Sequence, residues 1–214
     1  ISAVVALFTG LSYAELSSMF SKDVGEYIYA EKAFGRRIAF MIGWLIIITG
    51  IVTSTAVGMG FANYLHSLVG FPVLFSALGI ILLMSLVNMW GIKETSGLNI
   101  FFTLAEVFGL VLIVVLGLKY FGKVDYLYMP QGIKGIFNGA TLIFFAFLGF
   151  ESIVKLSEET KNPHKTIPRA LILSMIITTI LYVLVAISAV SMIGWEALAN
   201  SSAPLADVAA VALG

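Results

Sequence analysis

The most informative stretch of this chain is Asn138-Gly-Ala-Thr-Leu-Ile-Phe-Phe-Ala-Phe-Leu-Gly-Phe-Glu151. It belongs to an apolar run over residues 135–156 that is long enough for a membrane span, yet Gly149 and Glu151 lie where a lipid-facing helix would carry leucine or isoleucine. A charged residue near the bilayer centre costs about 2.5–3.5 kcal/mol on insertion scales, so it is retained where it faces a cavity or a partner. Because glycine permits backbone conformations that other residues resist, the pair predicts a helix broken near residues 145–150.

Such a break would turn freed carbonyl and amide groups toward a binding cavity. Glu151 would then lie in the first turn of the second half-helix, where the positive end of the helix dipole favours a carboxylate. The local sequence leaves one alternative open. In that alternative, Gly149 permits close helix packing and Glu151 pairs with a neighbouring helix.

The composition of the whole chain supports a membrane protein. Of 214 residues, 60% are hydrophobic and 11% are charged, and the mean hydropathy is +1.04. A soluble domain averages about 45–50% apolar and about 25% charged residues. The net charge is zero, which argues against a nucleic-acid partner, and the absence of cysteine excludes disulfides and thiolate chemistry. Neither of the two histidines lies in a metal-ligand pattern, so we expect no metal and no cofactor.

The apolar runs predict an all-α polytopic protein with one partial transmembrane domain over residues 1–214. The long second run suggests a tilted helix, and prolines suit the first turns of the third and sixth. Because Ile1 lies inside an apolar run, we expect a helix upstream of it. The expected helices cover residues 1–20, 38–68, 72–90, 98–121, 135–156 and 168–193, with a further helix starting after 203.

The distribution of lysine and arginine predicts the orientation. Alternating the loops across the membrane puts nine of these residues on one side and three on the other. Since cytoplasmic loops carry the excess of positive charge, loops 21–37, 91–97 and 157–167 should be cytoplasmic. Loop 21–37 is amphipathic and reads as an interfacial helix; a plain solvated loop is the alternative.

Two further polar positions lie inside the expected spans. Glu106 is eight residues into its span, about 12 Å from the start at 1.5 Å per residue. A carboxylate in such surroundings can hold a proton near neutral pH, so Glu106 is a candidate coupling residue, with a static hydrogen-bonded side chain as the alternative. Ser54 could line a cavity, although hydroxyls there usually bond back to their own helix.

Several stretches resemble the amino acid–polyamine–organocation (APC) family of transporters. Leu11-Ser-Tyr-Ala-Glu-Leu-Ser-Ser18 is similar to the cytoplasmic end of that family's second helix, and residues 25–44 to the following loop and third helix. Phe144-Phe-Ala-Phe-Leu-Gly-Phe-Glu-Ser152 resembles its broken sixth helix. Glu158-Glu-Thr-Lys-Asn-Pro163 with Ile167-Pro-Arg-Ala170 resembles the link to the seventh, and Pro204-Leu-Ala-Asp-Val208 the approach to the eighth.

The resemblance covers nearly the whole chain and implies the LeuT-type fold of two inverted five-helix repeats, present here in part. It implies a substrate site formed by the broken sixth helix and by a first helix that the chain lacks. Either Phe145 or Phe150 would close over the substrate, Glu151 would act in gating, and Glu106 would face the cation site, where some relatives carry lysine. Backbone carbonyls and wall contacts would come from Phe145, Ala146, Phe147, Leu148 and Gly149.

We therefore expect a secondary active transporter of amino acids in the plasma membrane, working by alternating access and coupled to a proton, with sodium as the other candidate. An amino-acid or polyamine exchanger is the alternative within the transporter class. A non-transporting receptor or membrane subunit is the alternative outside it. The chain offers no His–carboxylate metal set and no Ser–His arrangement, so we do not expect an enzyme.

Overall fold

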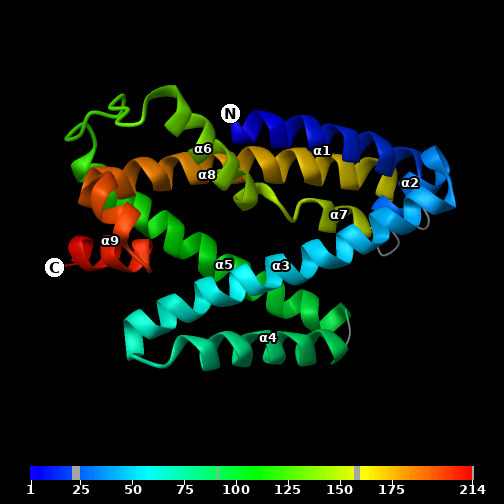
Figure 1. The fold of residues 1–214 in the computed structure, drawn as a ribbon, viewed down its shortest axis with the longest axis horizontal. Helices are drawn as coiled ribbons and strands as arrows, with labels where there is room; N and C mark the ends of the chain where they lie inside the picture. Colours follow the sequence, from blue (N-terminus) through cyan, green and yellow to red (C-terminus); the bar gives the residue numbers. More distant parts are fainter. Residues whose placement is uncertain (21–24, 91, 157–159, 214) are drawn as a thin grey trace. The chain divides into compact units, whose positions relative to one another are not determined.

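The computed structural model describes residues 1–20, 25–90, 92–156 and 160–213, without the side chains of residues 90, 92–96, 151 and 155. Throughout this part of the chain the structure is all-α, with no strand (Figure 1). The helices are α1 (Ser2–Met19), α2 (Glu26–Phe34), α3 (Arg36–Val69), α4 (Val73–Trp90), α5 (Ile92–Gly117), η1 (Leu118–Tyr120), α6 (Gly132–Phe144), η2 (Phe145–Phe147), α7 (Glu151–Lys155), α8 (Pro163–Asn200) and α9 (Pro204–Leu213).

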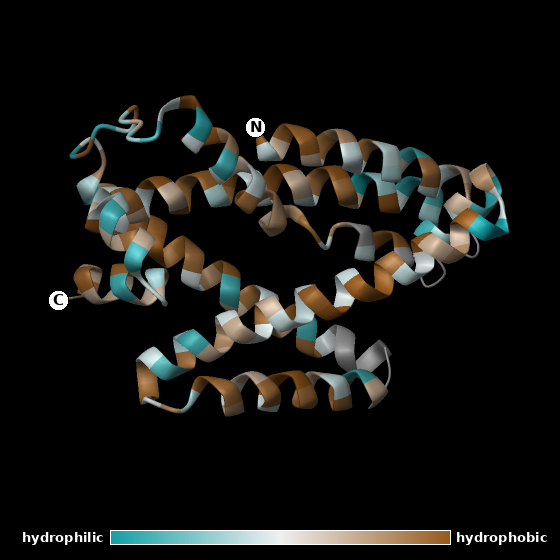
Figure 2. Ribbon diagram, in the orientation of Figure 1, coloured by the Kyte–Doolittle hydropathy of each residue, from teal (hydrophilic) through white to brown (hydrophobic). Residues whose placement is uncertain are grey.

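Four helical segments in the described residues are long and apolar enough to cross a membrane. They are Arg36–Val69, Gly97–Tyr120, Gly132–Val154 and Pro163–Asn200. Hydrophobic residues run along these helices, and hydrophilic residues gather mainly at their ends and in the loops (Figure 2). The four do not include two helices that the sequence predicted as spans. The second half of α1 carries Ser12, Glu15, Ser17 and Ser18, and the apolar helix Val73–Met89 of α4 is shorter.

Two helices differ from their expected bounds. The helix expected over 168–193 is α8, which begins at Pro163, so Pro168 does not open it but lies inside it. Proline is tolerated in the first turn, where its missing N–H would be unpaired in any case, and Pro163 takes that place. The helix expected to start at residue 98 starts at Ile92 as α5. The structure also has a helix, α2, in loop 21–37, of which residues 21–24 lie outside the described part.

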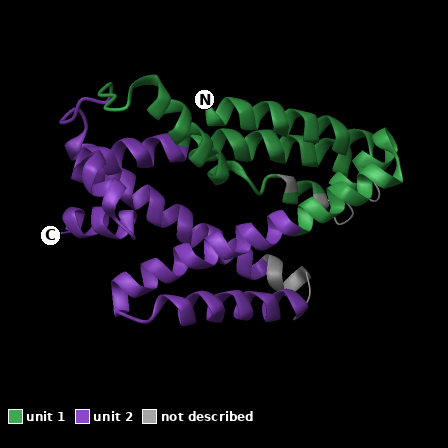
Figure 3. Ribbon diagram, viewed as in Figure 1, with its two compact units in different colours: residues 1–47, 127–180 green, residues 48–126, 181–214 purple. Residues whose placement is uncertain are grey.

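The chain divides into two compact units, which Figure 3 distinguishes. Unit 1 comprises residues 1–47 and 127–180, and unit 2 comprises residues 48–126 and 181–214. Unit 1 therefore holds α1, α2, the interrupted segment α6–η2–α7 and the first parts of α3 and α8. Unit 2 holds α4, α5, η1, α9 and the second parts of α3 and α8.

Unit 1 is organised around one face of α1. That face is built from small residues, which let neighbouring helices approach closely: Ser2, Ala6, Gly10, Ala14 and Ser17 are all buried. It packs against α6, η2 and α7, and the Ser2 hydroxyl donates a hydrogen bond of 2.6 Å to the Ala140 carbonyl. The Ser18 carbonyl accepts a 2.6 Å hydrogen bond from His164 Nδ1. This bond brings together the ends of two loops that were expected on the same side of the membrane.

Unit 2 has its own core. Ile113 of α5, Ala189 of α8 and Val208 of α9 are buried in one cluster. Two tyrosine hydroxyls join separate segments of this unit: those of Tyr126 and Ser191 are 2.7 Å apart, and the Leu205 N–H of α9 donates to the Tyr64 hydroxyl of α3 at 3.2 Å.

Candidate functional site

The α6–α7 segment is interrupted. The helix ends at Phe144 and continues as a single 3₁₀ turn over Phe145–Phe147. Leu148 is extended, with φ −68° and ψ 148°, and Gly149 has φ +111°. α7 then begins at Glu151. Because only glycine readily adopts such a positive φ, Gly149 allows the chain to leave one helix and enter the next.

The interruption changes the hydrogen bonding of the backbone. The Leu148 N–H donates to the Phe145 carbonyl at 3.1 Å, and the Ser152 N–H donates to the Gly149 carbonyl at 3.0 Å. Both bonds span three residues rather than the four of an α-helix. The α-helical ladder is therefore interrupted at this point, as it is in the discontinuous helices that form binding sites in transporters.

The side chains of the break divide into two environments. Phe145 is 42% exposed and Leu148 is 40% exposed, whereas Phe147 is buried. Ala146 and Gly149 are exposed as well. An open, apolar strip consisting of Phe145, Ala146 and Leu148 thus lies beside the backbone groups of the break.

Phe150 has a different environment from Phe145. Its ring packs edge-on against Tyr13 of α1, with centroids 5.6 Å apart. The ring centroid of Tyr29 of α2 lies 6.4 Å from that of Tyr13 and 5.7 Å from that of Phe20. These four rings form an aromatic cluster over the buried residues Ala14, Val154, Ile167 and Leu171. Edge-to-face aromatic pairs add stability beyond the area that they bury, so Phe150 anchors the start of α7 to α1.

The two tyrosine hydroxyls of the aromatic cluster differ in their hydrogen bonding. The Tyr13 hydroxyl donates to Glu26 Oε1 at 3.3 Å. The Tyr29 hydroxyl is buried and has no hydrogen-bond partner among the described residues. Burial, and secondarily the charge of Glu26, raise the pKa of Tyr29 to about 12. This cluster was not predicted from the sequence, in which the tyrosines of loop 21–37 are its visible signal.

Three predicted site residues remain, Glu151, Ser54 and Glu106. The backbone of Glu151 begins α7, and its side chain is outside the described part. Ser54 and Glu106 belong to unit 2. The Ser54 hydroxyl donates to the Gly50 carbonyl of its own helix at 2.8 Å. Glu106 is exposed on α5.

The described residues contain no group of three histidine, cysteine, aspartate or glutamate side chains that could hold a metal ion.

The chain is an integral α-helical membrane protein whose distinguishing feature is a helix interrupted within an apolar segment. This feature is typical of transporters that bind small solutes.

Comparison with known families identifies the class. A family model described as amino acid permease matches residues 1–214, so the chain belongs to the amino acid permease family. The resemblance to APC transporters stated above is thereby confirmed. This family, like the relatives described next, consists of permeases and transporters rather than enzymes.

Several curated proteins are similar to the chain. The branched-chain amino acid permease BcaP of Bacillus subtilis is 30% identical over 86% of this chain and 44% of its own length. The methylthioribose transporter of the same organism is 30% identical over 87% of this chain and 45% of its own length. Human cationic amino acid transporter 4 is 31% identical over 97% of this chain and 36% of its own length. The chain thus spans less than half the length of these relatives.

Proposed function

We propose that the gene product containing this chain is a secondary active transporter that carries an amino acid across the plasma membrane by alternating access. The observation that carries the proposal is the interruption at Leu148–Phe150, with Gly149 at φ +111°. Peptide groups at a helix break can bind the charged ends of an amino acid, and rigid-body movement around the break can expose them to either side in turn.

The apolar strip indicates what kind of substrate the site favours. Phe145, Ala146 and Leu148 offer exposed apolar surface beside the backbone groups. A site of this kind favours a substrate with an apolar side chain, because burial of apolar surface is worth about 25 cal/mol per Å². The relative named as a branched-chain amino acid permease fits this expectation. Phe145, rather than the anchored Phe150, is then the aromatic ring that can close over the substrate.

Glu106 is the residue that couples substrate transport to a cation in this proposal. Its carboxylate lies in an apolar helix that is long enough to span the membrane, where it can bind a proton or a sodium ion. Binding of that cation shifts the balance between inward-facing and outward-facing states if the two states bind it with different affinity. Uptake by symport would then depend on the cation gradient.

The test is uptake by the complete gene product in proteoliposomes. We expect accumulation of labelled leucine, competition by valine and isoleucine, and weak competition by arginine or methylthioribose. A pH gradient should drive accumulation, and Glu106→Gln should abolish its pH dependence.

The second candidate within the class is an exchanger of amino acids or polyamines. The relatives named as cationic amino acid transporters favour it. Exchange would be supported over symport if uptake requires a counter-substrate inside the vesicles and does not depend on the pH gradient. Failure of every amino acid to accumulate or exchange would refute the transport proposal.

A further inference from the structure

The first turns of α3 have one packed side and one open side. Ala39 is fully buried, and a Cβ atom at Gly43, one turn later, would lie 3.2 Å from the Tyr27 ring of α2. Helix α2 therefore packs against the side of α3 that carries Gly43. The side that carries Phe40 and Trp44 is open, because their side chains are 61% and 53% exposed.

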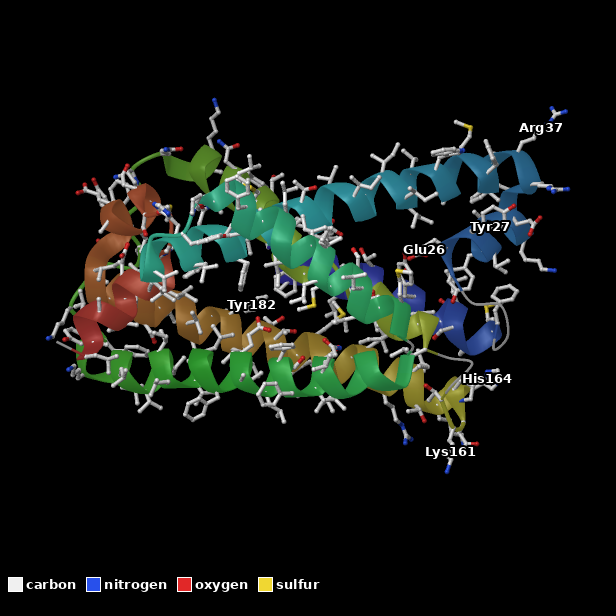
Figure 4. The ribbon with its side chains drawn as sticks, turned by 90° about the horizontal axis from the view of Figure 1, so that it is seen from below. Glu26, Tyr27, Arg37, Lys161, His164 and Tyr182 are labelled. Atoms are coloured by element: carbon white, nitrogen blue, oxygen red, sulfur yellow. The ribbon has the colours of Figure 1, made fainter. Side chains whose placement is uncertain are left out.

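The open side combines two arginines with two aromatic rings. Arg37, Phe40 and Trp44 follow each other at spacings of three and four residues, which places them on one face of the helix. Arg36 lies four residues before Phe40, and both arginines are exposed. The two rings pack edge-on with centroids 6.5 Å apart, and the Arg37 side chain points outward from the start of α3 (Figure 4). These four residues form the arginine–aromatic face.

The charge around the arginine–aromatic face is positive. Lys32 is exposed in the last turn of α2, and Gly35, at φ +82°, joins α2 to α3. Between Tyr27 and Trp44 the chain carries three basic residues and a single acidic one, Glu31. Anionic lipids at a membrane surface attract basic segments of this kind.

We propose that the arginine–aromatic face binds an anionic phospholipid, whose headgroup phosphate is held by Arg36 and Arg37 and whose acyl chains contact Phe40 and Trp44. A guanidinium group can donate two parallel N–H bonds to phosphate oxygens, and charge-assisted bonds of this type are strong. The lipid site is independent of the transport proposal, because none of its residues belongs to the break or to the candidate coupling position.

The length of the face favours a lipid over a soluble anion. Trp44 lies about 10 Å from Arg37 along the helix axis, at 1.5 Å per residue. The headgroup region adds about 5–8 Å on each side of the hydrocarbon, so arginines at the level of the phosphates place Trp44 near the hydrocarbon boundary, where tryptophan is enriched. Helix α3 is also long and apolar enough to cross the membrane. A free phosphate would contact the arginines alone, whereas a phospholipid contacts both parts of the face.

The experiment titrates a short-chain lipid, dioctanoyl phosphatidylglycerol, into the complete gene product in a neutral detergent and follows the thermal unfolding midpoint. A ligand that binds the folded state raises this midpoint as its concentration increases. We expect dioctanoyl phosphatidylglycerol to act at lower concentration than dioctanoyl phosphatidylcholine. Glycerol 3-phosphate, which carries the phosphate without acyl chains, should have no effect at the same concentrations.

Substitution of both arginines tests where the lipid binds. Arg36→Gln with Arg37→Gln should raise the concentration for half-maximal stabilisation about 25-fold, or about fivefold for each charge removed. Arg36→Lys with Arg37→Lys keeps both charges and should retain most of the affinity. The matched control is Lys119→Gln with Lys123→Gln, which removes two charges beside the Tyr120 ring in unit 2 and should leave that concentration unchanged.

Four results would overturn the proposal. Equal half-maximal concentrations for the two lipids would show that the anionic headgroup is not recognised, and equal effects of lipid and glycerol 3-phosphate would show a site for free phosphate esters. An unchanged concentration in the arginine pair would place the lipid elsewhere, and an equal loss in the lysine control would show a diffuse attraction to positive charge. Arg37→Gln alone, with an expected fivefold rise, replaces the arginine pair if the pair does not fold.

Discussion

The interrupted segment α6–η2–α7 and the continuous helices α3 and α5 carry polar groups through apolar stretches in different ways. In the interrupted segment the backbone itself supplies polarity, because Gly149 ends the α-helical ladder. In α3 and α5 the ladder continues, and side chains such as Ser54 and Glu106 supply the polarity. Ser54 is satisfied by its own helix, whereas a carboxylate needs a group from another helix. This contrast supports the proposal that the break binds the substrate and that Glu106 couples transport to a cation.

The largest effect should come from closing the break. Gly149→Ala places a Cβ on a residue at φ +111°, and such strained backbone costs about 1–3 kcal/mol. The segment must either distort or rewind, so substrate uptake should fall by about tenfold or more. Gly139→Ala in α6 is the control, because nothing lies within 4 Å of the added Cβ there. Equal uptake by both variants would show that the geometry at Gly149 is not needed for transport.

A second comparison separates the two phenylalanines that flank the break. Phe150→Ala should lower stability by about 2–3 kcal/mol, less than a fully buried phenylalanine, because the ring packs on Tyr13. Phe145→Ala should leave the thermal unfolding midpoint in detergent nearly unchanged and raise the KM for uptake. The reverse assignment, a stability loss at Phe145 and a KM effect at Phe150, would contradict the proposed division of roles.

The aromatic cluster can be tested through its hydroxyls. Tyr29 has a pKa of about 12, raised from 10.0 first by burial and then by Glu26. The folded protein thus holds this proton more tightly than the unfolded chain, so the corresponding stability is present below pH 10 and is lost as the pH rises toward 12. Unfolding midpoints measured from pH 8 to 12 should fall steeply over this range, and less steeply in Tyr29→Phe.

Tyr13→Phe provides the contrast at neutral pH. It removes a hydrogen bond to Glu26 and should cost about 1 kcal/mol. Tyr29→Phe removes a buried hydroxyl without a described partner, and should be neutral or stabilising. If Tyr29→Phe proves the more damaging of the two, the Tyr29 hydroxyl has a partner during folding or transport.

The smallest effect is expected on the continuous helix α3. Ser54→Ala removes a hydroxyl that bonds back to Gly50, so uptake should stay within about twofold of the parent, as for substitutions away from special features. Thr55→Val, at a neighbouring hydroxyl bonded to Ile51, serves as the comparison. A large rise in KM in Ser54→Ala, but not in Thr55→Val, would show that Ser54 takes part in substrate binding.

Some features of the site were open to prediction because they are local. Gly149 and Glu151 are unfavourable in a lipid-facing helix, and this is visible in the sequence without knowledge of other segments. The structure has its backbone break in this stretch. The helix bounds were less accessible, since Pro163 and Pro168 both suit a helix start and only one can open α8. The difference between Phe145 and Phe150 could not be read from spacing, because it depends on the ring of Tyr13 on another helix.

The apolar runs and the placement of charge indicate an all-α membrane protein, because both are properties of the chain residue by residue, and the motifs of the broken helix and its loops resemble those of permeases. Contacts between distant segments are visible in the folded chain alone: Phe150 packs against Tyr13, and His164 bonds to the Ser18 carbonyl. These contacts join residues of different helices, whose register follows from the packing of small residues such as Ala6 and Gly10 of α1. Packing of this kind depends on the shapes of both surfaces at once, and neither stretch of sequence carries that information alone.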